Sequence, residues 1–134
     1  PQTAAEARFS VPYVVATALL HGSVRLSAFD ASRLADPAIR QLMQRIELCV
    51  DPAIDAVFPG KRAAHIHIQT RDGRSGEHLQ PTRKGDPEEP LSDADLDEKF
   101  MELASPVIGD AAARQLLRTL WAMDAQQDIL SLQR

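Results

Sequence analysis

The amino-acid sequence predicts an α+β fold, and three observations lead to this class. Apolar residues recur with helical spacing in several segments, one stretch alternates with the period of a strand, and helices and strands do not alternate regularly along the chain. The predicted order is helix, helix, strand, hairpin, helix, helix. We therefore expect a small three- or four-stranded sheet packed with helices, in a single domain over residues 1–134.

The first helix is predicted over residues 11–21. Ser10 is a suitable N-cap, because its hydroxyl can accept a hydrogen bond from a free backbone N–H of the first turn. Pro12 fits that turn, since its missing N–H costs nothing there. The segment is apolar on nearly every side, which is typical of a buried helix, and Gly22 provides its C-terminal stop.

A second helix and a strand are predicted next. Asp36 is an N-cap followed by proline, and apolar residues then follow a helical period over residues 37–44. Residues 46–50 alternate between apolar and polar side chains, as a strand does. Residues 51–62 are expected to be irregular, with a turn at Phe58-Pro59-Gly60.

A β-hairpin is the clearest prediction in the chain. Residues 64–70 alternate strictly between apolar and polar side chains. Asp72-Gly73 is a hairpin turn dipeptide, because both residues tolerate positive φ. The return strand, residues 74–81, has a weaker pattern, and Pro81 indicates that it lies at an edge.

Helices are predicted for the rest of the chain after a polar loop at residues 84–90. Ser92 begins a capping box for a helix over residues 93–105, which ends before Pro106. Asp110 is expected to cap another helix, and a last short helix is predicted over residues 125–132. The inward-facing apolar residues are expected to be Leu96, Phe100, Leu103, Leu116, Leu117, Leu120 and Trp121.

Composition excludes several classes of protein. The net charge of −4 does not resemble the basic surface of a nucleic-acid-binding protein. The longest apolar run, residues 14–20, is too short to span a bilayer. The single cysteine, Cys49, rules out an internal disulfide, and we expect it to be a half-buried strand residue. We predict a cytoplasmic protein with no nucleic-acid or membrane partner.

Three histidines on the predicted hairpin suggest a metal site. His65 and His67 share one face of a strand, and His78 on the return strand could supply a third ligand. The alternative is a polar outer face of a half-exposed sheet. We favour this alternative, because no carboxylate or cysteine has a supporting spacing in the same element, and we predict no metal and no cofactor.

Two charged clusters are interpreted as structural. Four carboxylates lie near the start of the helix predicted from residue 93, where the positive end of the helix dipole stabilises negative charge. Lys61 and Arg62 could meet an anionic substrate, but a solvated loop explains them as well. The carboxylates are Asp93, Asp95, Asp97 and Glu98.

The start of the first helix is the best candidate for substrate binding. A helix N-terminus attracts anions through its free N–H groups and its dipole. Arg8 precedes Ser10, and Tyr13 lies one turn into the helix, so we predict that these three residues bind a carboxylate. The alternative is a capped core helix with Tyr13 hydrogen-bonded inside. The sequence contains no Gly-rich phosphate loop and no recognisable nucleophile motif.

Two motifs resemble the MmgE/PrpD family. Residues 6–22, EARFSVPYVVATALLHG, are similar to its acidic-Ala-x-Phe-Ser-x-x-Tyr motif and the apolar helix that follows. Residues 84–92, KGDPEEPLS, and then Lys99-Phe100 are similar to its Gly-x-Pro-x-x-Pro-Leu-Ser motif and Lys-Phe pair. One departure is His21, where the family often has Asp. A cation suits the negative end of the helix dipole, so we expect no functional change.

The resemblance implies the smaller, C-terminal α+β domain of a two-domain enzyme that acts on small di- or tricarboxylates without a cofactor. Dehydration of 2-methylcitrate is the first expectation, with decarboxylation of cis-aconitate and epimerisation of iminodisuccinate as the family's other reactions. The family's catalytic Asp, His and Lys residues have no matching positions in this sequence, so no catalytic residue is assigned. The domain would close one side of the active-site cleft beside a large helical domain.

Other interpretations stay open at this point. The chain begins at Pro1, and we expect a fragment of a larger chain that is inactive alone. The alternative function is a stand-alone binding or interaction module without catalytic activity. Because the helix over residues 11–21 is apolar on every face, we also expect the isolated chain to self-associate as a homo-oligomer.

Overall fold

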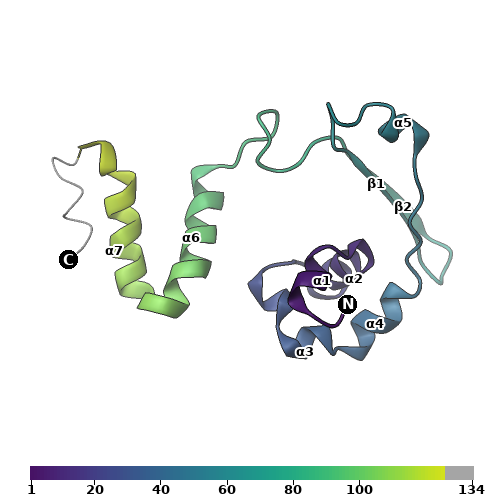
Figure 1. Ribbon diagram of the computed structural model, residues 1–134, viewed down its shortest axis with the longest axis horizontal. Coiled ribbons are helices and arrows are strands. Elements are labelled where there is room, and N and C mark those ends of the chain that lie inside the picture. The colour runs from purple at the N-terminus through teal and green to yellow at the C-terminus, as the bar shows by residue number, and fades with distance from the viewer. Residues whose placement is uncertain (126–134) are drawn as a thin grey trace. The chain divides into compact units, whose positions relative to one another are not determined.

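The computed structural model describes residues 1–125, and the chain divides into two compact units, Pro1–Asp55 and Ala56 onward (Figure 1). The first unit contains α1 (Ala4–Arg8), α2 (Val11–His21), η1 (Leu26–Phe29), α3 (Ala31–Leu34), α4 (Pro37–Met43) and α5 (Pro52–Asp55). The described part of the second contains β1 (Ala64–Gln69), β2 (Ser75–Gln80), α6 (Asp93–Ile108), α7 (Asp110–Trp121) and η2 (Met123–Ala125). The predicted α+β class is confirmed.

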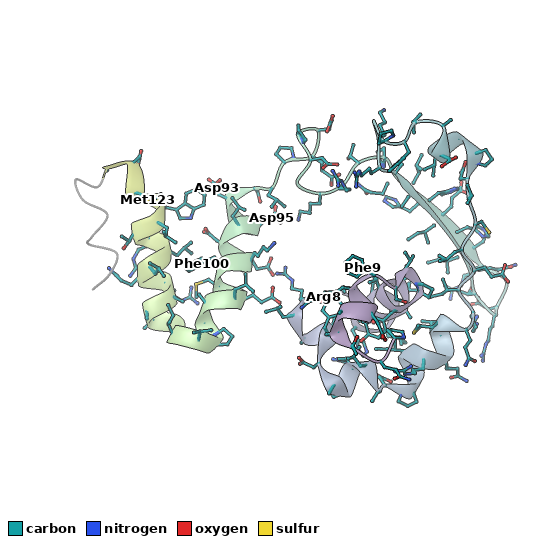
Figure 2. The ribbon with its side chains drawn as sticks, viewed as in Figure 1. Arg8, Phe9, Asp93, Asp95, Phe100 and Met123 are labelled. Carbon is teal, nitrogen blue, oxygen red and sulfur yellow. The ribbon has the colours of Figure 1, made fainter. Side chains whose placement is uncertain are left out.

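The short helix α1 precedes the first predicted helix and was not anticipated. A capping box starts it: Thr3 Oγ1 accepts from the Glu6 amide at 3.2 Å, and Glu6 Oε2 accepts from the Thr3 amide at 3.4 Å. Phe9 is the C-cap, and its side chain is 92% exposed (Figure 2). Five residues are too few for a periodic apolar pattern, so the capping box was the one signal for this helix.

The helix α2 has the predicted bounds and the predicted caps. Ser10 is the N-cap, and its Oγ accepts from the Tyr13 amide at 3.4 Å. Gly22 ends the helix with φ of 77°, a left-handed conformation that a glycine adopts without strain. The short elements after it, η1 and α3, were not predicted. They precede α4, which begins after the predicted N-cap Asp36.

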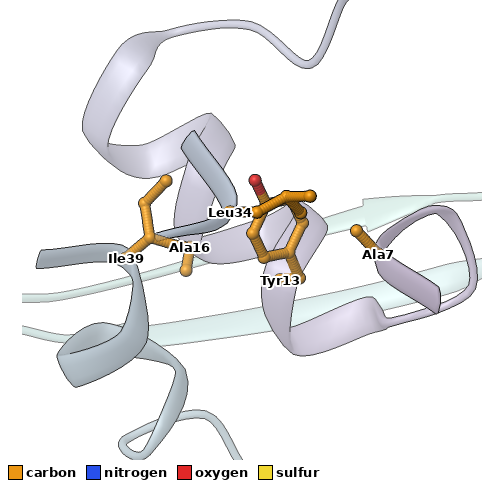
Figure 3. Close-up of a cluster of buried hydrophobic side chains, with 5 residues drawn as sticks. All are labelled: Ala7, Tyr13, Ala16, Leu34 and Ile39. Carbon is orange, nitrogen blue, oxygen red and sulfur yellow. The ribbon is translucent and has the colours of Figure 1, made fainter. Parts of the chain in front are cut away.

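A small apolar core lies among the helices of the first unit (Figure 3). Tyr13 and Ala16 from α2 contribute one side of it, and α4 contributes Ile39, which is completely buried. Ala7 from α1 and Leu34 from α3 complete the cluster. The core therefore depends on the two predicted helices and also on two short helices that the apolar pattern did not reveal.

The strand predicted over residues 46–50 is wrong, because this segment has no regular secondary structure. Its apolar side chains are exposed, Leu48 by 64% and Val50 by 79%, and Cys49 is exposed rather than half-buried. Alternation of polar and apolar residues makes a strand only where a neighbouring strand pairs with it. Within residues 1–125 the sheet accordingly has two strands, not three or four.

The predicted hairpin is confirmed. β1 and β2 pair antiparallel, from Ala64 opposite Gln80 to Gln69 opposite Ser75. The turn contains the predicted Asp72-Gly73, and Gly73 has φ of 85°. The strands end within one or two residues of the predicted limits.

The helices α6 and α7 form an antiparallel pair joined at Gly109. Ser92 caps α6 with the predicted capping box. The helix continues through Pro106 to Ile108, so the predicted end at residue 105 is wrong by about a turn. Asp110 is the first residue of α7, and the N-cap is Gly109. The helix predicted over residues 125–132 lies outside the described residues, apart from Ala125 in η2.

Candidate functional site

The predicted carboxylate-binding residues lie around one aromatic stack in the first unit. The Phe29 ring of η1 lies 6.4 Å from the Tyr13 ring, centroid to centroid, at an angle of 34°. The Arg8 guanidinium lies 5.3 Å from the centroid of the same Phe29 ring. A cation over an aromatic face is attracted by the ring's quadrupole. The fold therefore holds the Arg8 cation beside the start of α2.

Two of the three predicted residues use their polar groups inside the fold. The Tyr13 side chain is 1% exposed, and its hydroxyl donates to the backbone carbonyl of Ala28 at 2.6 Å. The Ser10 hydroxyl accepts the hydrogen bond of the helix cap. Arg8 is exposed. Arg8 is thus the member of the trio whose charged group is exposed, while Ser10 and Tyr13 fix the helix start beside it.

The three hairpin histidines lie on two different faces. In the register, His65 is opposite Leu79 and His67 is opposite Glu77, so both histidines share a face with Glu77. His78 is opposite Ile66 and therefore points to the other face. His65 Nε2 lies 3.6 Å from Glu77 Oε2. Among residues 1–125, no three His, Cys, Asp or Glu side chains are grouped as metal ligands would be.

The carboxylates at the start of α6 serve the helix and the preceding loop. Asp95 Oδ2 accepts from the Ser92 amide at 3.0 Å, and Asp95 Oδ1 accepts from Lys84 Nζ at 2.5 Å (Figure 2). The Lys84 ammonium, followed by the Ser92 hydroxyl and amide, holds the pKa of Asp95 well below its ordinary value of 3.8. The capping interpretation of this acidic segment is confirmed at Asp95.

The loop that carries the second motif is fixed by its own side chains. Glu89 Oε2 accepts from Gln80 Nε2 at 2.7 Å and from Thr82 Oγ1 at 2.9 Å. Arg83 pairs with Asp86 at 2.7 Å, and this pair lowers the pKa of the Asp86 carboxyl. These bonds hold the loop together and join it to the end of β2. Arg62, one of the two cations that precede β1, also has a local contact. Its guanidinium lies 5.6 Å from the centroid of the Phe58 ring.

Exposed apolar surface is the feature that sequence reasoning located least well. A groove of about 290 Å³ lies between α6 and α7, next to a 2.6 Å hydrogen bond from Trp121 Nε1 to Asp97 Oδ1. The Trp121 side chain is 50% exposed and that of Leu96 is 42% exposed. The groove is lined by Leu96, Asp97, Phe100, Leu117, Leu120 and Trp121. The sequence predicted these apolar residues as inward-facing, and in the described chain their inward face remains open to solvent.

The fold defines a small α+β domain that carries exposed apolar side chains on its last two helices. The comparison with known families is more specific. The chain belongs to the MmgE/PrpD C-terminal domain family, whose sequence model matches residues 1–124. The predicted family is confirmed.

Three curated proteins are similar to this chain. The mouse (Mus musculus) cis-aconitate decarboxylase is 27% identical over 138 residues, covering 100% of this chain and 27% of the mouse protein. The human (Homo sapiens) cis-aconitate decarboxylase is 27% identical over 128 residues, covering 96% of this chain and 26% of the human protein. A cis-aconitate decarboxylase-like protein of Aspergillus oryzae is 27% identical, covering 98% and 27% of the two chains.

The chain spans about a quarter of the length of the curated relatives it matches. In the part of the chain that the structure describes, every helix is too short or too polar to cross a bilayer.

Proposed function

We propose that this chain is the C-terminal domain of an MmgE/PrpD-type enzyme acting on small di- or tricarboxylates, and that it closes one side of the active-site cleft. The observation that carries the proposal is the family match over residues 1–124, in a chain that corresponds to about a quarter of each relative. The rest of such an enzyme would supply the helical domain and the catalytic residues.

The exposed apolar side chains support this proposal. Between residues 56 and 125, Ala113 is the one buried residue, while Val107 is 81% exposed. A domain that buries so little apolar surface by itself gains stability by packing on another domain, at about 25 cal/mol for each Å² removed from water. A helical domain of the same enzyme type is the partner that the family match favours.

Arg8 is the proposed contact to substrate from this domain. Its guanidinium is positioned over Phe29 and exposed, and a guanidinium can bind a carboxylate through two parallel hydrogen bonds. Ser10 and Tyr13 would position it through the capped start of α2. In this arrangement Arg8 binds and orients a carboxylate group of the substrate, and proton transfer belongs to residues outside this chain.

Two reactions are candidates for the complete enzyme. Dehydration of 2-methylcitrate, a hydro-lyase reaction, is the expectation from the family resemblance. Decarboxylation of cis-aconitate is favoured by the similar proteins, two of which are named cis-aconitate decarboxylase and the third a cis-aconitate decarboxylase-like protein. Both substrates are tricarboxylates, so a cationic group such as Arg8 is useful in either case.

The test is an activity assay of this chain with and without an MmgE/PrpD helical domain from the same source. We expect no turnover of cis-aconitate or 2-methylcitrate by the chain alone, and turnover of one of them by the complex. Arg8→Gln in the complex should raise KM more than it lowers kcat, because Arg8 is assigned to binding. Arg45→Gln is the matched control and should leave both constants unchanged.

Two outcomes would contradict the proposal. If the chain binds no helical domain and stays monomeric at high concentration, the alternative of a stand-alone binding module gains support. If the isolated chain turns over either tricarboxylate, the assignment of the catalytic residues to another domain is wrong.

A further inference from the structure

In the described part of the chain, the outer edge of β1 has no neighbouring strand. β1 pairs with β2 on its other side, and the sheet of residues 1–125 ends there (Figure 1). The Thr70 amide donates to the Arg74 carbonyl at 2.8 Å, so these two residues form a hydrogen-bonded pair at the end of the hairpin. Such pairs alternate along an antiparallel ladder, so every second residue of β1 directs its backbone N–H and C=O away from β2. These residues are His65, His67 and Gln69.

β1 lacks the features that usually protect a sheet edge from pairing with another chain. A protected edge carries a lysine, a proline or a bulge. β1 contains none of these, because its pairing with β2 is continuous and its sequence is AHIHIQ, and all 6 of its residues are exposed. The outer edge of β2 differs, since that strand contains Gly76 and Glu77 and is followed by Pro81. The edge of β1 is therefore the better acceptor of an additional strand.

The charges around β1 select the kind of strand that can pair with it. Residues 56–71 contain no Asp or Glu, although the chain as a whole has a net charge of −4. Lys61 and Arg62 precede β1, Arg71 follows it, and all three are exposed. Complementary charge across an interface favours the correct partner and disfavours others. Both ends of β1 therefore favour a strand that carries carboxylates.

The two faces of β1 add an alternating pattern to this preference. His65 and His67 lie on one face, and Ile66 and Ile68 lie on the other, where they are 39% and 37% exposed. The histidine face already accommodates one carboxylate, since Glu77 Oε2 lies 3.6 Å from His65 Nε2. Apolar pairs and pairs of opposite charge stabilise neighbouring strands. A strand beside β1 is therefore favoured when acidic residues meet the histidine face and apolar residues meet the isoleucine face.

A second copy of this edge is a poor occupant. Two β1 strands paired edge to edge would bring Lys61, Arg62 and Arg71 of both copies onto one small sheet, and like charges on neighbouring strands destabilise it. An acidic strand avoids this repulsion.

We propose that the outer edge of β1 binds an extended segment of a protein partner in which acidic residues alternate with apolar ones. The segment adds a third strand to the hairpin, with its backbone bonded to His65, His67 and Gln69. Backbone hydrogen bonds supply the affinity in this mode of recognition, and the alternating side chains supply the selectivity. The proposal does not depend on the enzymatic function proposed above.

Amide exchange of the intact chain, followed by NMR at neutral pH, tests this proposal with a defined probe. The probe is a peptide of alternating Glu and Val, as long as β1 (6 residues) and blocked at both ends. At a free peptide concentration about ten times the Kd, exchange of the His65, His67 and Gln69 amides should slow about tenfold, because only the unbound fraction exchanges at the original rate. The amides of α2, in the first unit, should not change.

A second peptide separates backbone pairing from attraction between charges. The same peptide with all of its backbone amides N-methylated keeps the side chains and their charge but has no N–H donors for a ladder. It should leave the three β1 amides unprotected. Equal binding of the two peptides would mean that β1 is only a cationic surface, and the proposal would be wrong.

Two variants test the choice of an acidic partner. Arg71→Glu should raise the Kd of the first peptide about twofold to fivefold, as expected for an exposed charge pair. Arg114→Glu, on α7, makes the same change of charge and is the matched control, which should leave the Kd unchanged. If Arg71→Glu binds as tightly as the unchanged chain, the charge argument fails. Slow exchange of the three amides that depends on protein concentration, without peptide, would show that a second copy occupies the edge and would overturn the proposal.

Discussion

The Tyr13 hydroxyl donates a 2.6 Å hydrogen bond to the backbone carbonyl of Ala28, and this bond connects α2 to η1 across 15 residues of chain. Both residues are buried, Tyr13 to 1% exposure and Ala28 to 4%. Replacing Tyr13 by Phe removes the donor and leaves a buried carbonyl without a partner. We expect a loss of about 1–3 kcal/mol in the free energy of unfolding, measured by urea denaturation.

Thr17 provides the control for this substitution. It lies one turn further along α2, it is 1% exposed, and its hydroxyl oxygen has no hydrogen-bond partner within the described residues. Thr17→Val has nearly the same shape and removes a polar group that gains nothing from burial, so it should be neutral or stabilising. In the complete enzyme, Tyr13→Phe should also lower kcat or raise KM. Unchanged kinetics would show that Tyr13 does not position Arg8.

The pKa of Asp95 should respond to Lys84. The Lys84 ammonium is the largest cause of the lowered pKa of this carboxyl, and Ser92 adds to it. A carboxyl with a lowered folded-state pKa stabilises the fold above its ordinary pKa of 3.8, and this contribution is lost as the pH falls through the lowered value. Lys84→Met should raise the pKa of Asp95 toward 3.8, so that α6 begins to lose its cap at a higher pH.

NMR titration of the carboxyl carbons measures this shift directly. Arg83→Met is the matched control, because Arg83 lowers the pKa of Asp86 and is not among the causes for Asp95. We expect that variant to raise the pKa of Asp86 alone. If Lys84→Met leaves Asp95 unchanged, the short Lys84–Asp95 contact does not persist in solution.

Phe9 and Ile39 should behave as opposites on substitution. Phe9 is 92% exposed, so Phe9→Asp should change the free energy of unfolding by no more than about 0.5 kcal/mol. Ile39 is 0% exposed, and Ile39→Ala should cost about 2–5 kcal/mol. If the face of Phe9 contacts a helical domain, Phe9→Asp should weaken that complex. Light scattering and thermal unfolding of both variants measure the two effects, and a large destabilisation by Phe9→Asp would contradict its exposure.

Trp121 reports on the groove between α6 and α7, because it is the single tryptophan of the chain. Binding of a partner over the groove should shift its fluorescence to shorter wavelength, since its side chain is 50% exposed in the structure. Asp97→Asn keeps the shape and an acceptor oxygen for Trp121 Nε1, and should change the spectrum little. Asp97→Leu removes the acceptor and should alter the spectrum of the unbound chain. If the Trp121 fluorescence does not change when the helical domain is added, that domain does not bind over the groove between α6 and α7.

The sequence predicted the elements that carry strong local chemistry. Ser10 with Pro12, Asp36 with Pro37, Asp72 with Gly73, and Ser92 each determine a backbone conformation through a few neighbouring atoms, and all four positions were located correctly. The two motifs that resemble the family, residues 6–22 and 84–92, contain two of these capping residues, Ser10 and Ser92.

What the sequence could not supply depends on partners far along the chain. The segment at residues 46–50 alternates like a strand, but no neighbouring strand pairs with it among residues 1–125, so it remains irregular. The sequence left two roles open for Tyr13, a ligand-binding residue and a core residue with an internal hydrogen bond. The position of its acceptor, Ala28, depends on η1, which has no periodic pattern. The opposite faces of His67 and His78 follow from the register, which the turn sets.

The uneven burial of the chain has a consequence for how it unfolds. Of the eight buried residues among residues 1–125, seven lie before Asp55, and Ala113 is the exception. Resistance to proteases follows the local cost of opening the backbone, and that cost is lowest where few apolar contacts are lost. Digestion of the purified chain should therefore leave a resistant N-terminal fragment of helices, while the hairpin and the last helices are cleaved early.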